Sequence, residues 1–261
     1  AICLSMSFVL PINAAGLGLG DEDTITAADT AVQSTATAPD GYKYNIFFLD
    51  CGRKYYSVSS IKAMINNASA AGFNYIQLAV GTDGLRFLLT DMSITVNGTT
   101  YESDTVKDAI HNGNTAYNTT ASKQYTEGGY TYKFDYSPDV NELTESEMDT
   151  IIAYAKSKGM GVIPCINTPG HMDAILSAAS ALSKTDCSYD NSVRTIDVTN
   201  TTAVAFTQAI LQKYITYFAG RGCKLFNMGA DEYANDIYST GGMGFAHLKS
   251  MSQYSYYVNY I

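Results

Sequence analysis

Residues 224–233 read Lys-Leu-Phe-Asn-Met-Gly-Ala-Asp-Glu-Tyr, an apolar, β-favouring run that leads through a glycine into two adjacent carboxylates. The run predicts a buried strand over residues 224–228, and Gly229 lets the chain leave that strand sharply. Carboxylates are rarely buried without partners, and two like charges side by side push one pKa upward. Asp231 and Glu232 are therefore candidates for acid–base chemistry. An acidic pair at a helix start is the other interpretation, and the pair alone leaves both open.

Three earlier segments repeat this pattern of a strand followed by a polar exit. The predicted strands lie at residues 44–50, 73–80 and 161–166. Their polar exits are residues 50–53, 81–84 and 167–171, and each contains Gly or Pro. Because the carboxyl ends of parallel strands meet at one edge of a sheet, these polar groups are expected to lie together.

Helix signals separate the strands. Ser57 can cap a helix that ends at Gly72, and residues 144–147 have the spacing of a capping box for a helix that ends at Gly159. Apolar spacing predicts a further long helix over residues 201–218. The alternation of strands and helices predicts parallel β/α units.

Residues 90–141 interrupt this alternation. They are rich in Thr, Asn, Tyr and Gly, and only residues 106–111 have helical spacing. We interpret the segment as a long insertion with small strands of its own, placed after the second strand of the sheet.

Four β/α units are compatible with an open doubly wound sheet and with a closed (β/α)8 barrel. Polar residues gathered at strand ends are typical of the barrel, whose functional groups lie at its C-terminal face. No glycine-rich phosphate loop follows the first strand, which argues against a nucleotide-binding sheet. The predicted fold class is therefore α/β, a (β/α)8 TIM-type barrel.

Composition limits the partners and the location. The net charge is −9 with no Lys- or Arg-rich run, which argues against nucleic acid or an anionic membrane as the main partner. Residues 1–16 are typical of the remnant of a secretory signal peptide and are too short for a membrane span; a buried N-terminal strand is the alternative. Residues 17–40 are typical of a flexible linker. We expect a secreted or cell-surface protein.

The cysteines give little support for a metal. Outside residues 1–16 the chain has Cys51, Cys165, Cys187 and Cys223, with no Cys-x-x-Cys spacing. Three of them, Cys51, Cys165 and Cys223, lie in apolar, strand-like contexts, where small buried thiols are expected. We predict no metal and no cofactor.

In order along the chain, the four strand ends resemble glycoside hydrolase family 20, the β-N-acetylhexosaminidases, especially the Gram-positive surface enzymes, and also bacterial lacto-N-biosidases. The stretches that carry the resemblance are residues 49–56, 83–89, 166–174 and 229–236. It implies retaining, substrate-assisted catalysis, in which the 2-acetamido oxygen of the substrate attacks the anomeric carbon and forms an oxazolinium intermediate.

The resemblance also implies roles for single residues. Glu232 would be the general acid and base, and Asp231 would orient the acetamide and stabilise its growing positive charge. Arg53 would bind the ring hydroxyls of the terminal sugar, and a structural salt bridge with Asp50 is the alternative. Asp83 and His171 would form a pair beside the general acid. Further expected supporting partners are Arg86 and Asp173.

The sequence departs from the family pattern in three places. After the second strand, a histidine and a tryptophan common in the family are replaced by residues such as Ala79 and Leu85. Residues 227–230 read Asn-Met-Gly-Ala where the family often has His-x-Gly-Gly. The barrel has eight strands, and residues 41–261 supply about four β/α units, so we expect the N-terminal part of a truncated barrel that is inactive alone.

The predicted function is removal of terminal β-linked N-acetylhexosamine from a glycan substrate. A lacto-N-biosidase, which releases a disaccharide, is one alternative. The other is a sugar-binding module that has kept the fold without catalysis. Protein partners cannot be predicted from these residues.

Overall fold

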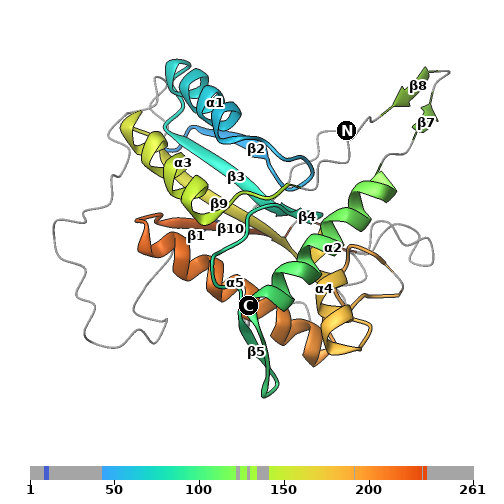
Figure 1. Cartoon of the computed structure of the whole chain (residues 1–261). Helices are drawn as coiled ribbons and strands as arrows, with labels where there is room; N and C mark the ends of the chain where they lie inside the picture. The colour runs from blue at the N-terminus through green and yellow to red at the C-terminus, as the bar shows by residue number, and fades with distance from the viewer. Residues whose placement is uncertain are drawn as a thin grey trace, which may run out of the picture.

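The computed structural model describes residues 9–11, 43–121, 124–127, 130–133, 141–190, 192–230 and 232–233. Its centre is a six-stranded sheet with the order β1-β10-β9-β3-β2, in which β4 also pairs with β3 (Figure 1). The strands are β1 (Val9–Pro11), β2 (Ile46–Asp50), β3 (Tyr75–Thr82), β4 (Gly84–Leu85), β9 (Gly161–Thr168) and β10 (Leu225–Gly229).

The four long strands are parallel and lie side by side in the order in which they occur along the chain. β2 pairs with β3, β3 with β9 and β9 with β10, each in parallel. The order does not reverse among these four strands, whereas a doubly wound sheet has a switch point. The predicted parallel β/α units are confirmed, and all four carboxyl ends meet at one edge.

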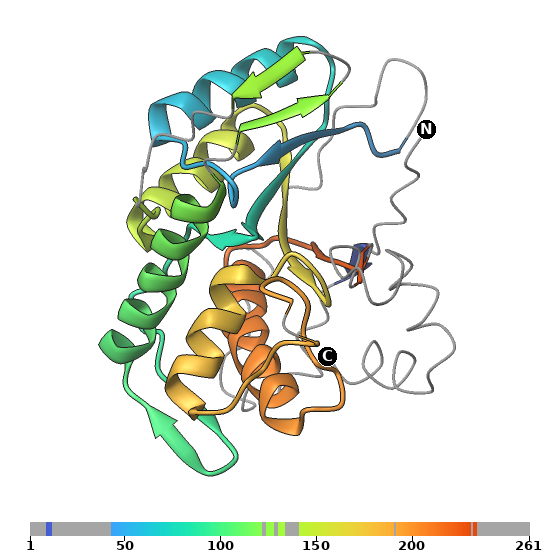
Figure 2. The same ribbon diagram turned by 90° about the vertical axis from the view of Figure 1, so that its right-hand side faces the viewer.

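Five helices are described: α1 (Val58–Ala70), α2 (Ser103–Ala121), α3 (Glu145–Ser157), α4 (Asp173–Ser183) and α5 (Thr201–Gly220). They gather on one side of the strands, which is clearest in the turned view (Figure 2). The predicted starts of two of them are confirmed. Ser57 Oγ accepts from the N–H of Ser60 at 3.3 Å, and Thr144 and Glu147 form the reciprocal capping box.

The core lies between the sheet and these helices. Ile61 and Ile65 of α1 and Leu78 of β3 have no solvent-exposed surface, and burying each such side chain contributes about 1.5–3 kcal/mol. Phe87 packs edge-on against Tyr214 and Phe218 of α5, with ring centroids 5.6 and 5.7 Å apart. The apolar side chains whose spacing predicted the helices are thus the ones that each helix packs against the sheet.

Two helices differ from the sequence prediction. α2 runs from Ser103 to Ala121, well beyond the predicted helical piece over residues 106–111, and α4 was not predicted. Packing explains the length of α2, since a Cβ on Gly113 would lie 2.9 Å from Cα of Ala174, so the two helices approach closely there. For α4, the alanine-rich run after Asp173 is the helix signal that could have found it.

The segment between β4 and α3 also contains the two small hairpins that its composition suggested. β5 (Ile94–Val96) pairs with β6 (Thr99–Tyr101), and β7 (Gln124–Glu127) pairs with β8 (Tyr130–Lys133). Asn114 of α2 anchors the segment, because its side chain donates to the carbonyl of Leu85 at 2.9 Å and accepts from the N–H of the same residue at 2.8 Å. Whether residues 90–141 are an insertion relative to the family stays a prediction.

At the N-terminus, Val9–Pro11 pairs antiparallel with β10. The alternative of an N-terminal strand therefore holds for these three residues. The interpretation of residues 1–16 as a signal remnant stays a prediction, since the rest of that range and the whole linker over 17–40 lie outside the described residues. Within the described ranges, no helix has both the length and the apolar character needed to cross a membrane.

The four described cysteines are buried free thiols, as predicted for Cys51, Cys165 and Cys223. Pro164 lies inside β9, a central strand, although a proline there removes one N–H from the strand pairing.

Candidate active site

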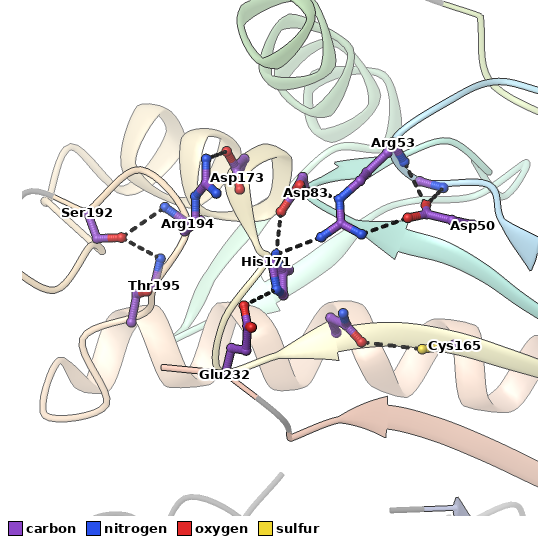
Figure 3. A network of polar contacts seen from close by, with 12 residues as sticks. Asp50, Arg53, Asp83, Cys165, His171, Asp173, Ser192, Arg194, Thr195 and Glu232 are labelled. Atoms are coloured by element: carbon purple, nitrogen blue, oxygen red, sulfur yellow. Dashed lines mark hydrogen bonds and ion pairs between the residues drawn. The ribbon is translucent and has the colours of Figure 1, made fainter. Parts of the chain in front are cut away.

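The four polar strand ends meet at the carboxyl edge of the sheet and form one network of side chains (Figure 3). Arg53 follows β2, Asp83 follows β3, His171 follows β9 and Glu232 follows β10. The structure therefore brings together four of the five residues predicted for the site. The fifth, Asp231, lies outside the described residues.

Arg53 is held by two carboxylates. Its Nη1 donates to Oδ2 of Asp50 and its Nε donates to Oδ2 of Asp83, both at 2.8 Å. Asp50 is itself fixed, because its Oδ1 accepts from the N–H groups of Gly52 at 3.1 Å and of Arg53 at 3.0 Å. The salt bridge with Asp50 is thus present, and 35% of the Arg53 side chain remains exposed for another partner.

A chain of polar contacts runs from the buried interior to the surface. Oδ1 of Asp83 lies 2.8 Å from Nδ1 of His171, and Nε2 of His171 lies 2.7 Å from Oε2 of Glu232. Side-chain exposure rises along it, from 5% for Asp83 to 12% for His171 and 41% for Glu232. Since an ionised Asp83 can only accept, Nδ1–H donates to it, and Nε2 is left to share a proton with Glu232.

The surroundings of Asp83 and His171 favour a negatively charged carboxylate and a positively charged imidazole. Burial by itself would raise the pKa of Asp83, but the hydrogen bond from His171 and the charge of Arg53 outweigh it and hold that pKa well below its usual range. Burial would likewise lower the pKa of His171, but the hydrogen bond to Asp83 and its negative charge outweigh burial and raise that pKa. Asp83 is therefore an ionised anchor that orients the imidazole and makes it more basic.

The backbone is strained where it presents these groups. Asp83 and His171 have φ of 58° and 56°, a region that residues with a side chain seldom occupy and that is found mainly at functional sites. The N–H of Asp83 donates to the carbonyl of His171 at 2.6 Å and locks the two turns together. At Gly170 a Cβ would collide with the backbone oxygen of Glu232, so only glycine lets the two exits approach.

The cavity beside this network has a volume of about 510 Å³, which is enough for one small polar ligand. Its lining includes Arg53, His171 and Glu232 of the network, together with residues of the strands such as Phe48, Asn167 and Asn227. Phe48 is 55% exposed, so the cavity combines an apolar surface with hydrogen-bonding groups. Within the described part of the chain, no three His, Cys, Asp or Glu side chains are grouped to hold a metal ion.

The two expected supporting residues lie close by. Arg86 is buried and donates to the carbonyl of Gly52 at 2.8 Å, so it supports the turn that carries Arg53. Asp173 is buried beside Asp83, with Nη2 of Arg194 at 3.9 Å from its Oδ1. Sequence reasoning missed Arg194, because it lies in an irregular segment between α4 and α5 where no periodicity or motif marks it.

Two asparagines that line the cavity were also not predicted as site residues, although both lie in or beside the stretches that carried the family resemblance. Oδ1 of Asn167 lies where a Cβ on Gly229 would clash. Oδ1 of Asn227 accepts from the N–H of Gly229 at 2.8 Å, and its Nδ2 has no hydrogen-bond acceptor among the described residues. Asn227 stands where the family often has histidine, so the polar position at this strand end is retained.

Comparison with known proteins finds similar structures and a matching family. The structure resembles that of the pneumococcal virulence factor StrH, studied for N-glycan recognition and hydrolysis, with 38% identity and a TM-score of 0.70 over 88% of this chain and 50% of that one. A structure from the tandem catalytic modules of the pneumococcal exo-β-D-N-acetylglucosaminidase StrH matches with the same identity and TM-score over 86% of this chain and 49% of that one. The chain therefore spans about half the length of these solved relatives.

A lacto-N-biosidase of Bifidobacterium bifidum is 29% identical over 113 residues, which are 43% of this chain and 10% of that protein. The sequence also matches the catalytic domain of glycosyl hydrolase family 20 over residues 42–255, which include all four strand ends of the network. The chain belongs to glycosyl hydrolase family 20.

Proposed function

We propose that this chain carries the acid–base half of a catalytic site that removes terminal β-linked N-acetylhexosamine from glycans with retention of configuration. The observation that carries the proposal is the 2.7 Å contact between Nε2 of His171 and Oε2 of Glu232. It joins a carboxyl group that faces the cavity to an imidazole whose other nitrogen is anchored on a buried carboxylate. Such a chain can supply a proton to a leaving oxygen and recover it from water.

In this mechanism Glu232 first protonates the glycosidic oxygen while the 2-acetamido oxygen of the substrate attacks the anomeric carbon. The bond to the leaving sugar breaks, and its oxygen keeps the proton. Water then attacks the oxazolinium intermediate, and Glu232 takes the proton that this water loses. His171 stabilises the ionised form of Glu232 between the two steps, and its own raised pKa suits that task.

Asp231 completes the scheme as a prediction. Its carboxylate would orient the acetamide group and stabilise the positive charge that develops on the acetamide nitrogen. Its position directly before Glu232 is the support for this role.

Arg53 would bind the sugar hydroxyls. Nε and one N–H of Nη1 are engaged by Asp83 and Asp50. Nη2 lies 3.0 Å from Nδ1 of His171, and it cannot donate to a ring nitrogen that already carries a proton. One N–H of Nη1 and the N–H groups of Nη2 thus remain for hydroxyl groups of a sugar.

The first test is Glu232→Gln in the intact protein that contains this chain, assayed on an aryl N-acetyl-β-glucosaminide. We expect kcat to fall by about 10²- to 10⁴-fold, because the amide cannot transfer a proton. Glu102→Gln is the matched control, since Glu102 lies just before α2, away from the network. Unchanged turnover in Glu232→Gln would refute the assignment.

A lacto-N-biosidase is the second candidate, supported by the similarity to the enzyme of Bifidobacterium bifidum. It would use the same residues and differ in the size of the released product. Chromatography of the products from a glycan that ends in a disaccharide containing N-acetylhexosamine distinguishes the two, since only the biosidase releases that disaccharide intact.

The architecture and the location are part of the same proposal. The unreversed order of four parallel strands supports the first half of a (β/α)8 barrel, with residues 41–261 inactive when isolated. A glycan substrate and the predicted signal remnant support a secreted or cell-surface location. A cooperative melt and full activity from residues 41–261 alone would contradict the half-barrel.

A further inference from the structure

Asp173, the first residue of α4, is a buried carboxyl group without adequate partners for a negative charge. Only 7% of the residue is exposed, and its Oδ2 has no hydrogen-bond donor in the described part of the chain. Nη2 of Arg194 lies 3.9 Å from Oδ1, which is too far for a hydrogen bond. A carboxylate buried in this way is costly unless it is neutralised.

Asp83 lies next to Asp173 and has the opposite environment. Its two oxygens accept from Nε of Arg53 and from Nδ1 of His171, both at 2.8 Å, so its negative charge is well stabilised. The negative charge of Asp83 also acts on Asp173 and, after burial, is the largest cause that raises the pKa of Asp173. Two neighbouring carboxyl groups can form a hydrogen bond only if one of them carries a proton, and the proton belongs on the group whose charge is less stabilised.

We propose that Asp173 is a protonated positioning residue whose O–H donates a hydrogen bond to the Asp83 carboxylate and so extends the chain Asp83–His171–Glu232 by one member. The backbone keeps the two carboxyl groups together: the N–H of Ala174 donates to the carbonyl of Asp83 at 2.8 Å, and the N–H of Asp83 donates to the carbonyl of His171 at 2.6 Å. Figure 3 shows Asp173 between Arg194 and the Asp83–His171 pair.

The charges around Asp173 agree with this protonation. Asp83 faces it from the turn after β3, and Arg194 faces it from the segment before α5. Asp186 of that segment lines the same cavity of about 370 Å³ as Asp173. Burial, followed by the charge of Asp83, raises the pKa of Asp173 to about 7 against the opposing effect of Arg194.

At a pH above about 7, Asp173 loses the proton that it donates to Asp83. Deprotonation of Asp173 would remove the hydrogen bond and place a second negative charge against Asp83. The proton on Asp173 is therefore a condition for the alignment of Asp83, and through it of the imidazole that contacts Glu232.

The decisive comparison is between the intact wild-type protein and Asp173→Asn, because the amide keeps a donor and does not titrate. The folded pKa of about 7 lies above the ordinary value of 3.8, so the wild-type protein loses stability relative to the variant as pH rises between these values. We expect its folding equilibrium constant to fall by up to about tenfold per pH unit relative to Asp173→Asn.

An infrared titration observes the proton directly. The C=O band of a protonated carboxyl group should disappear from the wild-type spectrum with a midpoint near pH 7 and be missing from Asp173→Asn. Asp104→Asn, whose side chain is 94% exposed at the start of α2, is the matched control and should follow the wild type. The proposal would be overturned if the stabilities of the wild type and Asp173→Asn changed in parallel with pH and both proteins showed the same infrared band.

Activity tests the positioning role, and this readout alone rests on the proposed function. Asp173→Ala should lower kcat/KM by about 3- to 10-fold, the effect of one lost hydrogen bond, and Asp173→Asn should restore most of it and lack the ionisation near pH 7. Equal losses in both variants would overturn the donor role. A protein that hydrolyses no such substrate would instead refute the proposed function, and the infrared and stability measurements would still decide the protonation.

Discussion

The two edges of the parallel sheet both contain residues with positive φ, but the residue types differ. At the edge where helices lead into strands, the turns after α1, α3 and α5 use Gly72, Gly159 and Gly222, with φ between 72° and 86°. Glycine adopts this conformation without a steric penalty. These turns are ordinary helix endings, and their residue type follows from backbone geometry alone.

At the opposite edge, where strands end, the residues with positive φ include side chains. Asp83, His171 and Ala230 have φ of 58°, 56° and 61°. Each such residue costs about 1–2 kcal/mol relative to a relaxed conformation. Two of the three belong to the polar network, so the strain accompanies side chains of the candidate site. The comparison separates an edge built for stability from an edge built around a site.

The strongest test of this comparison removes the charge at the centre of the strained edge. Asp83→Asn keeps the shape and tolerates positive φ, but it leaves Arg53 and His171 without their carboxylate. We expect a loss of about 1.5 kcal/mol, at the low end for hydrogen bonds to charged groups because Arg53 is a third exposed. Chemical denaturation of both proteins measures it.

The pH dependence of that loss has a defined sign. The lowered pKa of Asp83 gives stability that is present above its ordinary value of 3.8 and is lost as pH falls through the folded value. The raised pKa of His171 gives stability that is present below its ordinary value of 6.5 and is lost as pH rises through the folded value. The gap between wild type and Asp83→Asn should be widest between these two values, and a gap independent of pH would contradict the ion pair.

A second test compares one glycine from each edge. In Gly170→Ala the new methyl group meets the backbone oxygen of Glu232, whereas in Gly159→Ala it meets nothing within 4 Å and suffers only from a φ of 72°. Both should lose about 1 kcal/mol or more of stability. Only Gly170→Ala should also lower kcat, because it displaces Glu232. Equal activities in the two variants would remove the distinction between the edges.

The smallest expected effect comes from relieving strain. Ala230→Gly removes the penalty of a residue at φ 61°, but it increases the entropy of the unfolded chain and loses a buried methyl group. We expect a change within about 0.5 kcal/mol of zero, measured as a shift in Tm. A loss above about 2 kcal/mol would show that the buried methyl group and the chain entropy outweigh the strain at this turn.

Much of the architecture could be predicted because it follows from local rules. The cap at Ser57, the capping box at Thr144 and the apolar spacing of α5 lie in the sequence itself. The polar strand ends could also be predicted, since parallel strands in chain order must bring their carboxyl ends to one edge.

The remaining features depend on contacts between distant segments. The conformation of Asp83 is fixed by a hydrogen bond to the carbonyl of His171, 88 residues away in the chain. The length of α2 depends on the close approach of Gly113 to Ala174, which no propensity indicates. Arg194 reaches the network from an irregular segment. The role of Asp231 stays a prediction, since its placement lies outside the described residues.

The pairing of β1 with β10 limits how further strands can be added to the sheet. Each strand offers hydrogen-bonding groups to two neighbours, and β10 has β9 on one side and Val9–Pro11 on the other. Another strand can extend the sheet beside residues 225–227 only by displacing this short antiparallel strand. Val9–Pro11 thus covers the hydrogen-bonding edge that β10 would otherwise offer to a further strand.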